Sequence, residues 1–332
     1  MGIRDLAKDL NLSTATVSIA LFGDPAKSKL SAKTVERVRA YAKKVGYVPN
    51  RLARKIFQPH RNPMIGILLK QDNAIDRTLP VLRTAMDLFN ESSCEYLVQY
   101  CDARNIVSTI ETMLGFNVRQ IILIGLIKPE YLKGIERYRD LELYILDFEF
   151  REGAVCPPCR CWMAMDRIKT YRHLVKQLCQ QGFGPVGADA NVARFIRPFL
   201  AEDALIVPTT SKKLLERGEA KAPHVCQAIR EGRCRSLICH NDMLAVGIME
   251  GVLKEGFRIP EDLLLTGFNA MEMSAYTKVA LSSFRPPVEK HLRMVIDHLI
   301  HGKELPDHVI SEPEMFWRAS TGNFVWTEMR DE

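Results

Sequence analysis

Hydrophobic positions in the first sixty residues recur at the three- and four-residue spacing of amphipathic helices. The first such stretch has its apolar face at Ile3, Leu6, Ala7 and Leu10. A second begins after the good N-cap residue Ser13 and has its apolar face at Val17, Ala20 and Leu21. A third begins after Ser31 and is stopped by Gly46, with its apolar face at Val35, Val38, Ala42 and Val45. The pattern predicts a head made only of helices, in which the corner "NLS" separates the first two.

The pattern changes after the segment "PHRNP". Apolar runs of strand length, such as "MIGILL", "QIILIGLI" and "DLLLTGF", alternate with amphipathic stretches such as "TYRHLVKQLCQQG". Continuous apolar strands separated by helices are typical of parallel sheets that helices cover on both faces. About 270 residues of this kind are too many for one open sheet. The sequence therefore predicts an all-α helix-turn-helix head followed by an α/β body of two similar lobes with a cleft between them.

Charge is distributed unevenly between these two parts. Residues 1–61 contain thirteen Lys and Arg but only four Asp and Glu, a balance of +9, whereas the whole chain of 332 residues carries +6. The remaining residues therefore carry −3. A basic head on a mildly acidic body is typical of a nucleic-acid-binding module joined to another domain. A solvated basic surface without a partner is the competing interpretation, but the excess coincides with the helix-turn-helix pattern.

Targeting and redox signals favour the cytoplasm. The longest apolar run, residues 121–127, is far shorter than the roughly 20 residues of a membrane span. Arg4, Asp5, Lys8 and Asp9 interrupt the first apolar pattern, which argues against a secretory signal. We therefore expect a cytoplasmic protein whose nine cysteines are reduced thiols.

Two motifs suggest other chemistry but lack the necessary context. The segment "CPPCRC" places Cys156, Cys159 and Cys161 together, but a closed zinc site needs four ligands and no second C-x2-C exists. We interpret it as a Pro-rich loop between domains with incidental thiols. The segment "GFGPVG" (residues 182–187) matches a dinucleotide motif by letter, yet it follows a helical pattern and precedes a strand, the reverse of that fold. We interpret Gly182 as a helix C-cap. Because no P-loop, catalytic triad or H-E-x-x-H occurs either, we expect no enzyme, no cofactor and no bound metal.

Several segments together resemble the lactose-repressor (LacI/GalR) family of transcription regulators. In the head these are "IRDLAKDLNLSTATVSIAL" and "SAKTVERVRAYAKKVGYVPNRLARKI". In the body "SLICHNDMLAVGIMEGVLKEGFRIPEDLLLTGFN" is similar to the most characteristic stretch of the family, and "SSFRPPVEKHLRMVIDHLI" and "RAST" are similar to its closing segments. The resemblance implies a helix-turn-helix head, a hinge and a two-lobed body like that of periplasmic sugar-binding proteins.

This resemblance implies a division into three parts. Residues 1–48 form the DNA-binding domain, 49–61 the hinge helix and linker, and 62–332 the effector-binding and dimerisation domain. Within the body, lobe 1 takes about 62–158 and 284–310, and lobe 2 about 159–283 and 311–326.

The second helix of such a head lies in the major groove and presents its N-terminal residues to base edges. In this chain these are Ser13, Thr14, Ala15, Thr16, Ser18 and Ile19. Most relatives place an arginine after the T-V-S triplet, where this chain has Ile19. The hydroxyl and methyl groups here suit thymine methyl contacts better than bidentate hydrogen bonds to guanine. Two outcomes stay open: a different target site, or weakened specificity with more of the affinity from phosphate contacts.

The hinge segment "NRLARKIF" adds further predicted DNA contacts. The residues concerned are Asn50, Arg51, Ala53, Arg54, Lys55 and Ile56. In the family this segment becomes helical on DNA, and an apolar wedge opens a base step in the minor groove. Ile56 occupies the wedge position. The alternative is that Ile56 packs against its own head, because so short a helix is marginal alone.

The resemblance also implies an effector cleft at the carboxyl ends of the strands. Residues at positions that commonly contact the effector are Asp72, Arg194, Asn241, Asp242 and Asn269, with Arg197 as the alternative to Arg194. Asn269 stands where relatives usually have aspartate, and the chain between Gly187 and Leu205 is shorter than in relatives. These departures argue against a conventional sugar effector. Asn241 or Asp242 could instead serve only as a cap of the following helix.

The sequence as a whole therefore predicts a sequence-specific DNA-binding regulator, a repressor by family habit, that binds a near-palindromic operator as a homodimer. Its expected partners are double-stranded operator DNA and a small-molecule effector, for which a carbohydrate is one option, but no membrane. Two alternatives remain. One is a regulator with a degenerate cleft that no longer responds to a sugar, and the other is a cytoplasmic ligand-binding protein with weak nonspecific DNA affinity.

Overall fold

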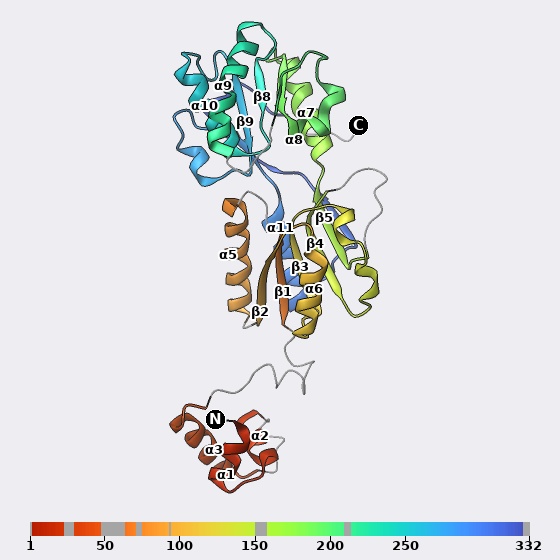
Figure 1. Cartoon of the computed structure of the whole chain (residues 1–332), viewed down its shortest axis with the longest axis vertical. Helices are drawn as coiled ribbons and strands as arrows, with labels where there is room; N and C mark the ends of the chain where they lie inside the picture. Colours follow the sequence, from red (N-terminus) through yellow and green to blue (C-terminus); the bar gives the residue numbers. More distant parts are fainter. Residues whose placement is uncertain are drawn as a thin grey trace. The chain divides into compact units, whose positions relative to one another are not determined.

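A computed structural model describes the chain in two separate compact units, Met1–Arg61 and Asn62–Glu332. The residues it describes are 2–22, 30–47, 64–70, 75–92, 94–149, 158–208 and 214–327. Figure 1 shows the first unit as a cluster of helices and the second as two sheets flanked by helices. The predicted fold class is thereby confirmed.

The described residues of the first unit form three helices around a small apolar core. They are α1 (Ile3–Leu10), α2 (Thr14–Phe22) and α3 (Ala32–Lys44). Both predicted N-caps are present, since Ser13 Oγ accepts a hydrogen bond from the Thr16 amide at 3.0 Å and Ser31 Oγ accepts one from the Thr34 amide at 3.2 Å. The core consists of Leu6, Ala7, Leu10, Val17, Ala20, Val35, Val38 and Ala42, which confirms the helical spacing of the predicted stripes.

The first lobe of the second unit is built on a parallel sheet with the strand order β11-β5-β4-β3-β1-β2. Its strands are β1 (Ile65–Lys70), β2 (Tyr96–Cys101), β3 (Gln120–Ile127), β4 (Glu142–Phe148), β5 (Cys161–Met165) and β11 (His308–Ser311). Helices α5 (Ile75–Glu91) and α11 (Val288–His301) pack on one face, and α6 (Ile106–Gly115) packs on the other (Figure 1). The inner strands β1, β3, β4 and β5 are largely buried on both faces and need the continuous apolar runs that the sequence contains, whereas the edge strands β2 and β11 are partly exposed.

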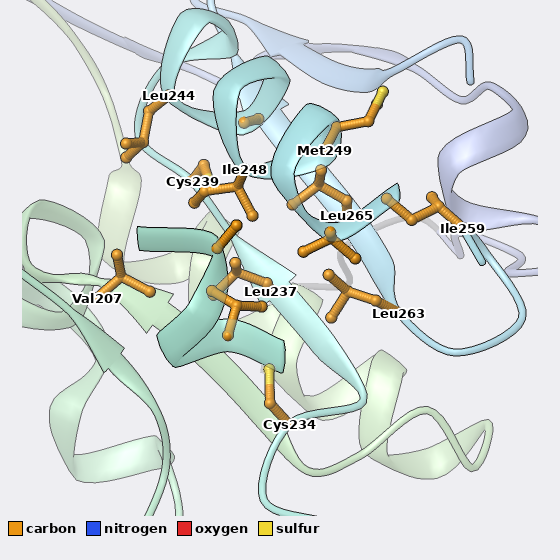
Figure 2. Close-up of a cluster of buried hydrophobic side chains, with 14 of the residues drawn as sticks. Val207, Cys234, Leu237, Cys239, Leu244, Ile248, Met249, Ile259, Leu263 and Leu265 are labelled. Atoms are coloured by element: carbon orange, nitrogen blue, oxygen red, sulfur yellow. The ribbon is translucent and has the colours of Figure 1, made fainter. Parts of the chain in front are cut away.

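The second lobe repeats this plan with the strand order β12-β10-β9-β8-β6-β7. Its strands are β6 (Val186–Asp189), β7 (Ile206–Val207), β8 (Ser236–Ile238), β9 (Leu264–Phe268), β10 (Ser282–Arg285) and β12 (Glu314–Phe316), of which only the β10–β12 pair is antiparallel among the described pairs. Helices α7 (Arg167–Gln180) and α8 (Ala190–Ile196) cover one face, and α9 (Leu214–Arg230) and α10 (Asp242–Lys254) the other. Figure 2 shows Ile248 of α10 beside Leu237 and Leu265 of the sheet, in a buried cluster that also includes Leu244 and Met249.

Short 3-10 helices complete the second unit. They lie at Pro129–Leu132, Ile135–Arg137, Arg197–Phe199, Glu272–Ala275 and Ala319–Thr321. None of the helices in the described ranges is both long and apolar enough to cross a membrane.

The chain passes between the two sheets at different places from those expected. Because β5 pairs with β4 and β11, the first lobe extends to Met165 and not only to about residue 158. Likewise β10 keeps residues up to Arg285 in the second lobe, and β11 keeps Ser311 in the first. The interpretation of the Cys-Pro-rich stretch as a loop between lobes is therefore wrong: Cys161 begins a buried strand of lobe 1, and Cys159 packs against the core of the same lobe. Cys156 lies outside the described residues.

Gly182 follows α7 with a φ of +79°, and its amide donates to the Cys179 carbonyl. Strand β6 begins only at Val186, after the segment "GFGP". The glycine-rich segment therefore ends a helix, as predicted, and does not open one as a dinucleotide motif would.

Candidate nucleic-acid interface and ligand cleft

The exposed face of α2 carries no charged side chain. Ser13, Thr14 and Ala15 are exposed, Thr16 and Ser18 are half-buried, and Val17 and Ala20 face the core. Ile19 is 44% exposed, so its side chain is accessible on the surface of the head. Of the six sequence-predicted residues, Ser13 thus directly precedes α2 and the other five lie within it.

Ser13 is the N-cap residue of α2. Its hydroxyl caps the helix and also lies 2.8 Å from Thr16 Oγ1. The helix N-terminus nevertheless favours an anion, because the first backbone amides point outward there. Capping and phosphate binding are therefore compatible at this residue.

The neighbouring helices α1 and α3 carry exposed positive charge. Lys8, Lys33, Lys43 and Lys44 are exposed. Arg37 and Arg39 are partly used for structure, because Arg37 Nη2 donates to the Leu10 carbonyl at 3.1 Å and Arg39 Nε donates to the Ala20 carbonyl at 3.2 Å. Their charge at the C-terminal ends of α1 and α2 is also favourable for the helix dipoles. The six hinge residues predicted to bind DNA, Asn50, Arg51, Ala53, Arg54, Lys55 and Ile56, lie outside the described residues.

Two of the predicted effector residues, Asn241 and Asp242, make hydrogen bonds within their own lobe. Asn241 is buried and caps α10, its Oδ1 accepting from the Met243 amide at 2.7 Å. Asp242 is fully buried and accepts hydrogen bonds from Ser283 Oγ at 2.6 Å and from the Met271 amide at 2.7 Å. Burial raises the pKa of Asp242 to about 6, against the hydrogen bonds that lower it. Both side chains thus serve contacts within lobe 2, and Asp72 lies outside the described residues.

Among the predicted effector residues that the structure describes, Asn269 lines a cavity of about 1280 Å³ and the others do not. Its backbone has a φ of +98°, and its amide donates to the Phe284 carbonyl at 2.7 Å. Residues of both lobes line this cavity, among them Leu79, Arg83, Met243, Glu289 and Arg318. This volume is larger than most small ligands need, so the cavity has room for a small molecule in contact with both lobes.

The side chain of Arg194 extends from lobe 2 and contacts lobe 1. Its Nη2 lies 3.4 Å from Glu149 Oε2, although Arg194 belongs to α8 of lobe 2 and Glu149 follows β4 of lobe 1. A second pair of the same kind joins Arg167, the first residue of α7, to Asp147 of β4 at 2.5 Å. Sequence reasoning missed Asp147, Glu149 and Arg167. The available signal was the presence of two carboxylates in the otherwise apolar run "LYILDFEF".

His291 is a buried histidine near the segments in which the chain passes from one lobe to the other. Its Nε2 lies 3.0 Å from Ser311 Oγ, and its Nδ1 has no hydrogen-bond partner within the described part of the chain. Burial lowers the pKa of His291 to about 4, although the nearby Asp147 carboxylate acts in the opposite direction.

We expect His291 to make the body less stable as the pH falls from about 6.5 to about 4. The unfolded chain binds a proton to this imidazole below pH 6.5, whereas the folded chain leaves it neutral down to about pH 4. The contribution is fully present above pH 6.5, and its loss amounts to roughly 3 kcal/mol at most. Thermal unfolding of His291→Gln across this range should fall less steeply than that of the wild type. His301→Gln, at an exposed position on the same helix, should follow the wild type; equal slopes for all three proteins would contradict the assignment.

Comparison with known proteins supports both units. Residues 2–50 match the family model described as bacterial regulatory proteins, lacI family, and residues 170–321 match the periplasmic binding protein-like domain. The repressor CytR of Escherichia coli (strain K12) is 22% identical over 304 residues, covering 86% of this chain and 84% of the relative. The repressor PurR of Yersinia enterocolitica is 22% identical over 357 residues and covers 99% of both chains.

Solved structures show the same fold. The lac repressor dimer bound to operator and the anti-inducer ONPF superposes with a TM-score of 0.76 at 17% identity, covering 97% of this chain and 99% of that one. A regulator of the same family from Silicibacter pomeroyi superposes with a TM-score of 0.74 over the same shares. The named relatives are transcriptional repressors and not enzymes.

A helix-turn-helix head with an uncharged face on its second helix, followed by a two-lobed periplasmic-binding-protein-like body, defines a DNA-binding regulator of transcription. Together the two matched ranges span more than half of the chain. The chain thus carries a DNA-binding domain of the lacI family and a periplasmic binding protein-like domain, in the order that its sequence predicts.

Proposed function

We propose that this protein is a cytoplasmic homodimeric repressor that binds a near-palindromic operator and responds to a small-molecule effector. Two heads related by a two-fold axis match two half-sites of an operator. Residues 1–48 bind the major groove, residues 49–61 form the hinge, and the body from residue 62 dimerises and binds the effector. The body carries no catalytic role in this proposal and needs no cofactor or metal.

The exposed, uncharged face of α2 within a basic head carries this proposal. Thr14, Ala15 and Ile19 contact base edges, while Ser13, Thr16, Ser18 and the hinge donors Asn50, Arg51, Arg54 and Lys55 hold phosphates. Ala53 and Ile56 complete the hinge, with Ile56 as the apolar wedge in the minor groove. Because phosphate contacts fix register without conveying sequence, the three residues of α2 determine which half-site is bound.

Footprinting on genomic promoter fragments tests the function. We expect protection of a discrete site with approximate two-fold symmetry. Uniform coating of all fragments, or no binding at low ionic strength, would contradict a sequence-specific regulator. Uniform coating would favour a ligand-binding protein with weak nonspecific DNA affinity, whereas no binding would argue against a DNA-binding role altogether.

We expect the operator to be recognised partly through thymine methyl groups that contact Ile19. Replacing the contacted thymine by uracil in both half-sites removes two methyl groups, each worth about 0.8 kcal/mol when buried. Affinity in a gel-shift titration should fall roughly tenfold for the dimer.

The Ile19→Ala variant supplies the control for this experiment. It should bind the thymine and uracil operators almost equally, because the side chain that covers the methyl group is gone. An undiminished preference of Ile19→Ala for the thymine operator would show that another residue makes the contact.

For the effector we propose a cleft that includes Arg194, Asn269 and, from the family positions, Asp72, Asn241 and Asp242. Effector binding changes the relation of the two lobes and so whether the paired hinges fold on DNA. Coupling of this kind is reciprocal, so operator must change effector affinity by the same factor. Equal effector affinity with and without operator would exclude it.

A second candidate is a regulator whose cleft no longer responds to a sugar. The hydrogen bonds of Asp242 within its own lobe and the pairing of Arg194 with Glu149 favour it, because both reduce the polar groups that a sugar could use. Calorimetric titration with a panel of monosaccharides separates the two candidates.

A further inference from the structure

Two carboxylates at the end of one strand reach across to the other lobe. Asp147 lies in β4 and Glu149 follows it directly, so both belong to lobe 1. Their partners Arg167 and Arg194 belong to α7 and α8, whose apolar faces pack on the sheet of lobe 2. Each pair thus joins one lobe to the other.

The two pairs differ in burial and in distance from the crossing. Arg167 and Asp147 are 8% and 1% exposed, and Arg167 is two residues after the end of β5, where the chain passes into lobe 2. Arg194 lies further along the chain on α8 and is 33% exposed, whereas Glu149 is only 3% exposed. The first pair is therefore closed off from solvent beside the crossing, and the second pair has one face toward solvent.

Burial makes the loss of either partner costly while the lobes stay together. A carboxylate removed from water needs a positive partner or hydrogen bonds, since an uncompensated buried charge is strongly destabilising. Asp147 also has a φ of +67°, a conformation that residues other than glycine rarely adopt and that the surrounding structure must maintain. The end of β4 is thus held in the shape that presents its acidic side chains to lobe 2.

We propose that the Asp147–Arg167 pair is a pivot between the lobes, and that the Glu149–Arg194 pair is a latch that keeps the lobes closed without a bound ligand. The chain itself then supplies the charged bridge across the cleft that a ligand would otherwise make. An effector that competes with Glu149 for Arg194 opens the body. An effector that leaves Arg194 paired with Glu149 tightens it. This inference rests on the proposed role of the cleft in regulation, but the closure it describes does not depend on DNA binding.

Hydrogen–deuterium exchange of the full-length protein without ligand tests the latch. In Arg194→Gln we expect peptides covering residues 142–149 and 190–196 to exchange roughly tenfold faster than in the wild type, because the lobes open more often. Glu149→Gln should have the same effect, and the double variant should exceed neither single variant. The charge swap, Glu149→Arg with Arg194→Glu, should restore slow exchange, which a purely local effect on folding would not do.

Arg197→Gln is the matched control. Arg197 lies three residues further on, and its guanidinium donates only to the carbonyls of Ala201 and Glu202 in its own lobe among the described contacts. It should leave exchange at residues 142–149 unchanged. Equal exchange in Arg194→Gln and Arg197→Gln, or no rescue by the charge swap, would overturn the latch. Gel shifts with the same variants report DNA binding separately, so a failure of the latch is distinguishable from a failure of the proposed function.

Discussion

Raising the salt concentration from 50 to 200 mM is expected to weaken operator binding by about a thousandfold or more. A dimer that places six or more cationic side chains on phosphates releases the counterions condensed there, and affinity then falls steeply with salt. The exposed Lys8, Lys33, Lys43 and Lys44 supply candidate charges in each head, in addition to the basic hinge. Because α2 contributes no charge, nearly all of this electrostatic term must come from neighbouring elements. Fluorescence anisotropy with a labelled operator at several salt concentrations measures the slope.

A scrambled fragment of equal length is the control for this measurement. It should bind more weakly but with a similar slope, because phosphate contacts are independent of sequence. The Ile19→Ala variant should lower the affinity for operator without changing the slope. A loss of less than tenfold between the two salt concentrations would contradict a binding mode dominated by phosphates.

Replacing Gly247 by alanine is expected to destabilise the body by about 3 kcal/mol or more. Helices α9 and α10 touch through their backbones at this point: a Cβ on Gly247 would lie 2.1 Å from the Leu215 carbonyl oxygen and 2.9 Å from the Cα of Gly218. Backbone atoms cannot move aside as a flexible side chain can, so the helices must separate. Separation would disturb the packing of Leu244 and Ile248 on the sheet (Figure 2). Thermal unfolding should show a midpoint lower by roughly 10 °C.

Gly115 provides a matched substitution. It is the last residue of α6, and a Cβ there would meet nothing within 4 Å. Gly115→Ala should therefore leave the midpoint unchanged or raise it slightly, because alanine favours the helix. If Gly247→Ala unfolded at the same temperature as Gly115→Ala, the close approach of α9 and α10 would not matter for stability.

The head was predictable because its signals are local. Helical spacing of Leu6, Val17 and Val38, serine at both N-caps and a glycine stop all act within a few residues. The body was predictable as a class, because apolar runs alternating with amphipathic stretches indicate parallel sheets. The boundaries between its lobes were harder to predict. Strand β5 is only five residues long and follows a Cys-Pro-rich stretch. Its place in the first sheet depends on pairing with β4 and β11.

The ligand cleft was predictable only in part. Family positions led to Arg194, Asn241, Asp242 and Asn269, but their local sequence does not say which side chains face a ligand. Asp242 is held by Ser283 and Met271, which are 41 and 29 residues away in the chain. Only the packing of β9 and β10 beside α10 brings these groups together.

By itself, the sequence determined the helical head, the alternation of strands and helices in the body, the concentration of positive charge in residues 1–61 and the similarity of the head to the lacI family. These properties follow from neighbours three or four residues apart, from alternation along the chain and from composition. Only the tertiary structure decided that Arg194 pairs with Glu149, that Arg167 pairs with Asp147, and that Gly247 lies against Gly218. Such contacts arise where segments distant in sequence meet at a crossing between lobes or between helices, and no local periodicity specifies which residues will meet there.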